Sequence, residues 1–108
     1  MPGTKLSHVD LVVSSLERSL PFYLGLLGPL GWTVGEIEGE RGETVHYVSA
    51  PGPPGTSAIG LREAQSDAHD APYDRYALGV HHVCIDVPSR EVVDERAAWL
   101  AEEGAEIE

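Results

Sequence analysis

Apolar and polar residues alternate at the start of the chain and then repeat at helical spacing. Residues 5–13 alternate and are rich in aliphatic side chains, a pattern typical of a β-strand. Ser14 and Glu17 then have the spacing of a helix capping box, and leucines follow at intervals of three and four. Pro21 would remove an amide donor from the interior of this helix, so we expect regular helix to begin near Ser19.

Three further segments complete the first part of the pattern. A polar turn separates two strand-like runs, and a Pro/Gly-rich loop precedes a third. The strands are predicted over residues 32–38, 43–50 and 57–64. Residues 1–64 therefore predict a βαβββ module of the α+β class.

The pattern restarts after a polar stretch at 65–78, which we interpret as a linker. Residues 79–87 predict a strand, residues 91–103 a helix, and residues 105–108 the start of another strand. A shift of 74 residues aligns 7–13 with 81–87, so the chain contains an internal repeat. We expect one structural domain of two modules, of which the second, 79–108, is incomplete, and a natural chain that continues beyond Glu108.

Composition and charge limit the classes of partner. The chain has 108 residues with 18 acidic and 7 basic side chains, a formal charge of −11. Such a chain is repelled by nucleic-acid phosphates, and its apolar runs are too short for a membrane span. We therefore expect a cytoplasmic protein that binds neither nucleic acid nor membrane.

Several short motifs, in order along this repeat, resemble the vicinal oxygen chelate superfamily, which includes glyoxalase I, extradiol dioxygenases and bleomycin-resistance proteins. The resemblance covers nearly the whole chain and is carried by three groups of residues: His8-Val9-Asp10-Leu11-Val12-Val13; Ser19-Leu20-Pro21-Phe22-Tyr23 with Leu27-Gly28 and Gly31-Trp32; and His81-His82-Val83. It implies paired βαβββ modules that curl around a cavity, with metal ligands on the first and fourth strands of each module.

The resemblance matches His8 and His82 to the family's first-strand metal ligands. Residues two apart share one face of a strand, so His8 and Asp10 would face the cavity, whereas His81 would point away from it. The implied cofactor is a divalent metal ion such as Zn, Fe, Mn or Ni. The matching fourth-strand position is Gly60, which has no ligating atom, so a third ligand would have to come from outside this sequence.

Other polar and aromatic residues are candidates for binding or catalysis. Arg62 shares the predicted face of Gly60 and is a candidate for contact with an anionic substrate, although a salt bridge at the strand end is an equal alternative. His46 is a candidate acid or base, and only one of His46 and its neighbour Tyr47 can face the cavity. The candidate substrate-binding residues are Asp10, Trp32 and Tyr47.

Two functions fit this picture. The first is a divalent-metal-dependent lyase, isomerase or dioxygenase that acts on a small oxygenated substrate. The alternative, which Gly60 favours, is a metal-free protein that binds a small molecule or antibiotic, as the bleomycin-resistance branch does. We expect a homodimer in both cases, because an incomplete second module leaves a sheet edge uncovered.

Overall fold

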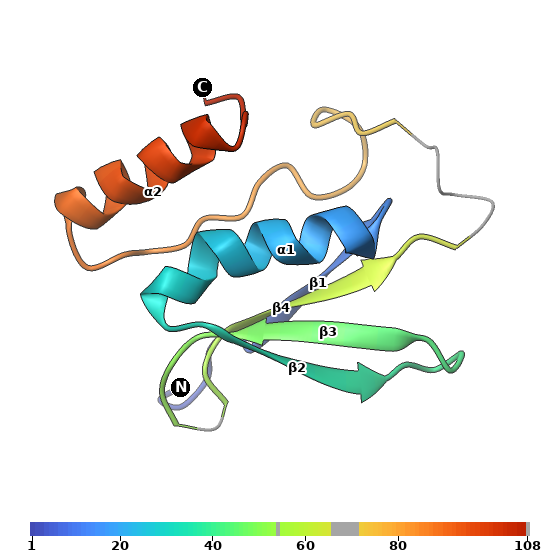
Figure 1. Cartoon of the computed structure of the whole chain (residues 1–108). Coiled ribbons are helices and arrows are strands. Elements are labelled where there is room, and N and C mark those ends of the chain that lie inside the picture. The colour runs from blue at the N-terminus through green and yellow to red at the C-terminus, as the bar shows by residue number, and fades with distance from the viewer. Residues whose placement is uncertain (54, 66–71, 108) are drawn as a thin grey trace. The chain divides into compact units, whose positions relative to one another are not determined.

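The computed structural model describes residues 1–53, 55–65 and 72–107 (Figure 1). The chain forms two compact units, residues 1–70 and residues 71–108. The division between them falls in the segment predicted as a linker. Within the described ranges, no helix is long and apolar enough to cross a membrane.

The first unit is the predicted βαβββ module, which confirms the α+β class. Its elements are β1 (His8–Val13), α1 (Leu16–Leu27), the short 3-10 helix η1 (Gly28–Leu30), β2 (Thr33–Glu38), β3 (Thr44–Ser49) and β4 (Ala58–Glu63). The strands form one sheet in the order β1-β4-β3-β2, with β1 and β4 parallel and the other pairs antiparallel. Residues far apart in the sequence, on β1 and β4, are therefore neighbours at the centre of the site described below.

One face of this sheet packs against α1. The buried side chains on this face are Val48, Ile59 and Leu61, and Val48 is paired with Ile59 across β3 and β4. The helix α1 contacts both strands and contributes the buried Leu27. Full burial of such a side chain stabilises the fold by about 1.5 to 3 kcal/mol. Because side chains alternate along each strand, the residues between these apolar positions are directed to the opposite face of the sheet.

The start of α1 differs from the predicted one. The helix begins at Leu16, with Ser15 rather than Ser14 as its N-cap, and the Ser15 hydroxyl accepts a hydrogen bond from the Arg18 N–H. The preference for a start near Ser19 was therefore wrong, and Pro21 lies inside the helix on an exposed position. The missing N–H leaves only one intrahelical bond unmade, and packing against the sheet outweighs that loss.

The second unit contains α2 (Arg90–Glu102), close to the predicted helix. Its N-cap Ser89 accepts from the Val92 N–H at 3.3 Å, as Ser15 does from Arg18 at the same distance, so the 74-residue repeat reproduces the helix start. Gly104 follows with a φ of 82°, a left-handed conformation that glycine adopts without strain.

The strands predicted over 79–87 and from residue 105 are wrong for the described residues. Residues 80–87 and 105–107 have no regular secondary structure, and residue 108 lies outside the described part of the chain. A strand is stabilised by hydrogen bonds to a neighbouring strand, and the described residues of the second unit supply no such neighbour. Alternation alone therefore does not produce a strand here.

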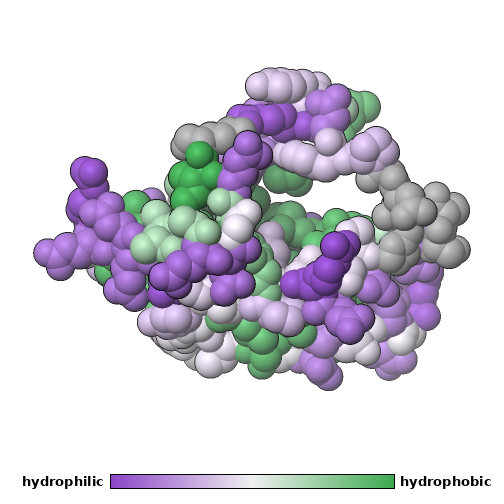
Figure 2. All heavy atoms as spheres, turned by 45° about the horizontal axis from the view of Figure 1, so that its top comes forward, coloured by the Kyte–Doolittle hydropathy of each residue, from purple (hydrophilic) through white to green (hydrophobic). Residues whose placement is uncertain are grey.

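Hydrophilic residues cover much of the face seen in Figure 2, with groups of hydrophobic residues between them. Among the exposed apolar side chains are Val34 and Ile37 on β2, which are 44% and 52% exposed, and Val12 on β1, which is 68% exposed. β1 and β2 are the two edge strands of the sheet, so apolar surface is available at both edges.

The assignment of Ser15 as the N-cap gives a direct test. Ser15→Ala should lower the free energy of unfolding by about 1 kcal/mol, because one N–H of the first helical turn loses its acceptor. Ser14→Ala is the matched control and should leave stability almost unchanged. Urea denaturation of the three proteins measures both effects, and a larger loss in Ser14→Ala would contradict the assignment.

Candidate functional site

A row of residues crosses the face of the sheet opposite α1. The strand register pairs Asp10 with Gly60, Gly60 with Tyr47 and Tyr47 with Gly35. Paired residues on neighbouring strands point to the same side, so this row brings Asp10 and Tyr47 together over Gly60, which lies between them. We call this side the polar face.

Asp10 is the centre of the polar face. Its Oδ2 accepts a hydrogen bond from the Tyr47 hydroxyl at 3.0 Å and from Arg62 Nε at 2.7 Å. The Asp10 and Arg62 side chains are 24% and 30% exposed, so the ion pair is partly shielded from water. Charge-assisted hydrogen bonds in such surroundings are stronger than exposed surface pairs. We refer to Asp10, Tyr47 and Arg62 as the Asp10 cluster.

Arg62 also joins the cluster to the β2–β3 turn. Its Nη1 donates to Glu43 Oε1 at 3.2 Å, while Glu43 Oε2 accepts from the Arg41 backbone N–H at 2.8 Å. Backbone N–H groups, first of all its own, and the positive charge of Arg62 hold the pKa of Glu43 below its usual range. The turn, β4 and β1 are thus linked through one guanidinium group.

The environment keeps Tyr47 protonated and Arg62 charged. Burial raises the pKa of Tyr47 above its ordinary value of 10.0, and the hydrogen bond to Asp10 raises it further. The hydrogen bond to Asp10, and to a lesser extent the neighbouring Tyr47 side chain, raise the pKa of Arg62 in turn. Tyr47 therefore donates to Asp10 Oδ2 as a phenol and Arg62 as a guanidinium.

His8 lies beside the cluster and remains half exposed. Its Nε2 is 4.0 Å from Asp10 Oδ1, and its ring meets the Tyr47 ring edge-on with centroids 5.3 Å apart. Asp10 Oδ1 is buried and has no hydrogen-bond partner among the described residues. Most buried polar atoms in proteins have a hydrogen-bond partner, so this oxygen is an unsatisfied acceptor at the centre of the polar face.

Gly60 makes this arrangement possible. A Cβ at residue 60 would collide with the Asp10 carboxylate and would lie 2.7 Å from the Tyr47 ring. The carboxylate of Asp10 thus occupies the space that a side chain at the fourth-strand position would need. Glu63, three residues further along β4, does not replace it on the polar face: its Oε1 accepts a hydrogen bond from the Leu16 N–H at the start of α1.

His46 and Trp32, like His8, lie outside the Asp10 cluster. His46 pairs with Leu61 and so points to the α1 side of the sheet, where its Nδ1 is 3.5 Å from Glu36 Oε1. Of His46 and Tyr47, it is Tyr47 that belongs to the polar face. Trp32 immediately precedes β2, at the same end of the sheet as His8.

His82, the second predicted metal ligand, belongs to the second unit. Its Nδ1 lies 2.8 Å from Nδ1 of His81, and the Tyr73 hydroxyl lies within hydrogen-bond distance of the His81 carbonyl oxygen at 2.9 Å. Among the described residues, no three His, Cys, Asp or Glu side chains gather in a group that could hold a metal ion.

Sequence reasoning missed the part played by Glu43 and the reason for Gly60. Both depend on strand register: Glu43 meets Arg62 because β3 and β4 are antiparallel, and Gly60 meets Asp10 because β1 and β4 are parallel. The loop lengths and the alternation pattern are compatible with more than one register, so the sequence carried no signal for either contact.

Replacement of the two glycines of the row tests the packing of the polar face. Gly60→Ala should lower the free energy of unfolding by about 1 to 3 kcal/mol, because the new methyl group collides with Asp10 and Tyr47. Gly35→Ala is the control from the same row: a Cβ there meets nothing within 4 Å, so stability should be unchanged or higher. Thermal denaturation compares the two, and equal tolerance of both substitutions would contradict the arrangement.

Comparison with known proteins agrees with this architecture. A solved structure described as "a putative glyoxalase from Bacillus halodurans" is 25% identical in sequence and superposes with a TM-score of 0.73, covering 94% of this chain and 71% of that chain. No curated protein matches the chain. The family model of the Glyoxalase/Bleomycin resistance protein/Dioxygenase superfamily matches residues 5–108. The chain therefore belongs to the Glyoxalase/Bleomycin resistance protein/Dioxygenase superfamily.

Proposed function

We propose that this protein binds a small oxygenated molecule on the polar face of its first unit, and that binding does not require a metal ion. The observation that carries the proposal is the position of Gly60. The fourth-strand residue has no ligating atom, and the Asp10 carboxylate fills the space above it. The central carboxylate of the polar face, Asp10, already accepts hydrogen bonds from Tyr47 and Arg62, so it is not a free metal ligand.

The donor set of the first unit does not fit a complete metal site. Asp10 Oδ2 accepts two hydrogen bonds, one of them from a guanidinium whose positive charge opposes a nearby divalent cation. His8 is then the other metal-ligand type beside the Asp10 cluster, and its Nδ1 already lies 3.2 Å from the Ser7 hydroxyl. Metal-free binding, as in the bleomycin-resistance branch, agrees best with this geometry.

The unengaged groups define the chemistry of the ligand. Asp10 Oδ1 has no partner and can accept a hydrogen bond from a hydroxyl group. Arg62 uses Nε and Nη1 within the protein and has further N–H donors for a ligand oxygen. The rings of His8 and Tyr47 offer an adjacent aromatic wall, and we propose Trp32, at the same end of the sheet, as a further contact.

A second candidate is a metal-dependent enzyme in which His8 and His82 hold a divalent ion. The favouring observation is that Asp10 Oδ1 is buried without a partner and lies 4.0 Å from His8 Nε2, so these two atoms face the same space. Zn, Fe, Mn or Ni bound there would stabilise negative charge on substrate oxygens, as lyase, isomerase and dioxygenase reactions require. In this candidate Arg62, rather than His46, is the side chain placed to contact the substrate.

We further propose that the protein is a homodimer. β1 and β2 each have one edge without a strand partner among the described residues, and apolar side chains such as Val12 and Ile37 are exposed on these strands. Pairing with a second copy would cover both the free backbone groups and the apolar surface.

A ligand screen on chelator-treated protein tests the proposed function. Hydroxy acids, oxo acids, aldehydes and catechols would be screened by thermal shift, and the affinity of the best ligand measured by calorimetry. Tyr47→Phe should weaken binding by about five- to tenfold, since loss of the hydroxyl frees Asp10 from one of its two donors and disturbs the position of Oδ1. Tyr23→Phe, which removes a hydroxyl from α1, should leave the affinity unchanged.

The same screen separates the two candidates. Binding that appears only after a divalent metal is added, and that disappears in both His8→Ala and His82→Ala, would replace the first candidate with the metalloenzyme. Equal affinities of the wild type and Tyr47→Phe without metal would overturn the assignment of the polar face as the binding site.

A further inference from the structure

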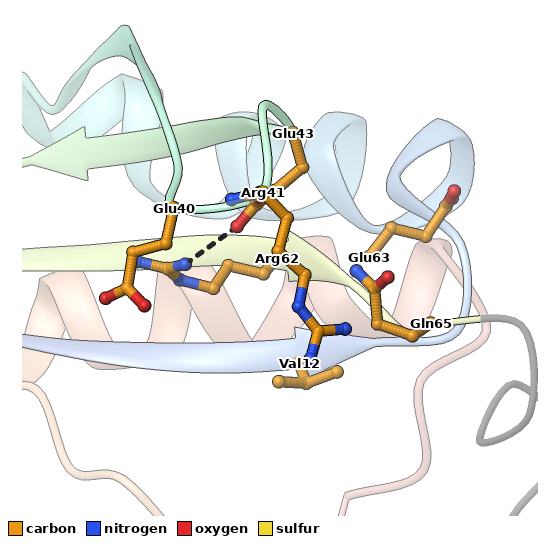
Figure 3. A pocket seen from close by; sticks show the side chains of 7 residues that line it. All are labelled: Val12, Glu40, Arg41, Glu43, Arg62, Glu63 and Gln65. Carbon is orange, nitrogen blue, oxygen red and sulfur yellow. Dashed lines mark hydrogen bonds and ion pairs between the residues drawn. The ribbon is translucent and has the colours of Figure 1, made fainter.

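A groove lies at the end of the sheet where the β2–β3 turn passes over β1 and β4. Its volume is about 420 Å³, and it is lined by residues of the turn and of the last positions of both strands (Figure 3). The groove belongs entirely to the first unit and shares Arg62 with the Asp10 cluster. It therefore adjoins the proposed binding face.

Two of the three acidic side chains in the groove are already engaged. Glu43 accepts hydrogen bonds from the Arg41 N–H and from Arg62, and Glu63 accepts one from the Leu16 N–H. Glu43 is thus paired with the charge of Arg62, and Glu63 is stabilised by a backbone donor at the start of α1. Glu40, an exposed residue of the turn, is the remaining acid.

The two basic side chains of the groove, Arg41 and Arg62, have N–H donors that form no hydrogen bond with the described residues. Within the described residues, the guanidinium of Arg41 forms no hydrogen bond or ion pair, and it extends across the groove toward Val12 (Figure 3). A guanidinium carries five N–H bonds, and Arg62 uses one at Nε and one at Nη1. Two of the seven basic residues of a chain with net charge −11 thus line one groove.

We propose that this groove binds the carboxylate of a small monocarboxylic acid. Arg41 and Arg62 would donate hydrogen bonds to the carboxylate oxygens, the Gln65 side-chain amide lies at the same groove, and the exposed side chain of Val12 offers an apolar surface for the hydrocarbon part of the acid. The inference rests on the proposed function. A ligand whose carboxylate lies in the groove would place its other oxygen atoms at the Asp10 cluster.

The charges of the groove limit the ligand to a monoanion. Glu40 lines the groove with an unengaged carboxylate, so a second negative charge on the ligand would be repelled. The net charge of the protein also lowers the local concentration of anions, which makes the two guanidinium groups necessary for any carboxylate to bind.

Titration with a simple acid and its amide tests the proposal. Isovalerate and the neutral isovaleramide would be titrated into the ¹⁵N-labelled full chain, with dissociation constants taken from amide and guanidinium shifts in NMR spectra. Isovalerate should bind with saturation at millimolar concentration and isovaleramide should not. Arg41→Gln should lower the affinity for isovalerate at least about fivefold, and Glu40→Gln should raise it. Arg18→Gln is the matched control: it removes the same charge from an exposed position of α1 and should have no effect on the affinity.

The inference would be overturned by no saturable binding of isovalerate, by equal binding of isovaleramide, or by the same weakening in Arg18→Gln as in Arg41→Gln. The spectra also report whether each variant is folded. If isovalerate shifts the NMR signals of His8 and Tyr47 but binds Arg41→Gln with unchanged affinity, the groove is not the binding site. That result would leave the proposed function intact. Binding at the groove with no effect of Tyr47→Phe on any ligand would reject the proposed function instead.

Discussion

The ion pair between Asp10 and Arg62 joins the two parallel strands at the centre of the polar face. The same carboxylate oxygen accepts the Tyr47 hydroxyl, so β1, β4 and β3 are connected through one atom. Arg62 extends the network to Glu43 and hence to the β2–β3 turn. Loss of Arg62 would leave the partly buried Asp10 carboxylate with the Tyr47 hydroxyl as its hydrogen-bond donor, and loss of Asp10 would leave Arg62 with Glu43. Either loss is more costly than loss of an exposed pair.

This network depends on a residue with no side chain. Gly60 is buried between Asp10 and Tyr47, and the position that resembles a family ligand site is instead the floor on which the Asp10 carboxylate rests. The opposite face of the same strands is apolar and covered by α1, with Ile59 and Leu61 on either side of Gly60 in the sequence. One strand therefore supplies both the core and the floor of the candidate site, and the two-residue period of the strand keeps them apart.

Much of this arrangement could be predicted from the sequence. Alternation placed His8 and Asp10 on one face and Arg62 on the face of Gly60, and the contact between Arg62 and Asp10 agrees with both. The salt bridge considered for Arg62 at the strand end also forms, with Glu43 as well as Asp10. Spacing and alternation were sufficient because they report which side of a strand a residue occupies.

The remaining features depend on contacts that a local pattern does not contain. Serine is a good N-cap residue, and the two adjacent serines Ser14 and Ser15 both fit a local pattern, whereas the structure has Ser15 at the N-cap. Residues 79–87 alternate as β1 does, yet remain without strand structure because a strand also needs a partner. The tie between Glu43 and Arg62 required the register of β3 against β4, which alternation leaves open.

The most direct test of the account is the energetic coupling between Asp10 and Arg62. A double-mutant cycle with Asp10→Asn, Arg62→Met and the double variant, followed by chemical denaturation at neutral pH, measures the interaction free energy separately from the other effects of each substitution. We expect a favourable coupling of about 1 to 3 kcal/mol, because the pair is partly buried and directly hydrogen-bonded. Additive effects, with a coupling near zero, would mean that the polar face is not organised by this ion pair.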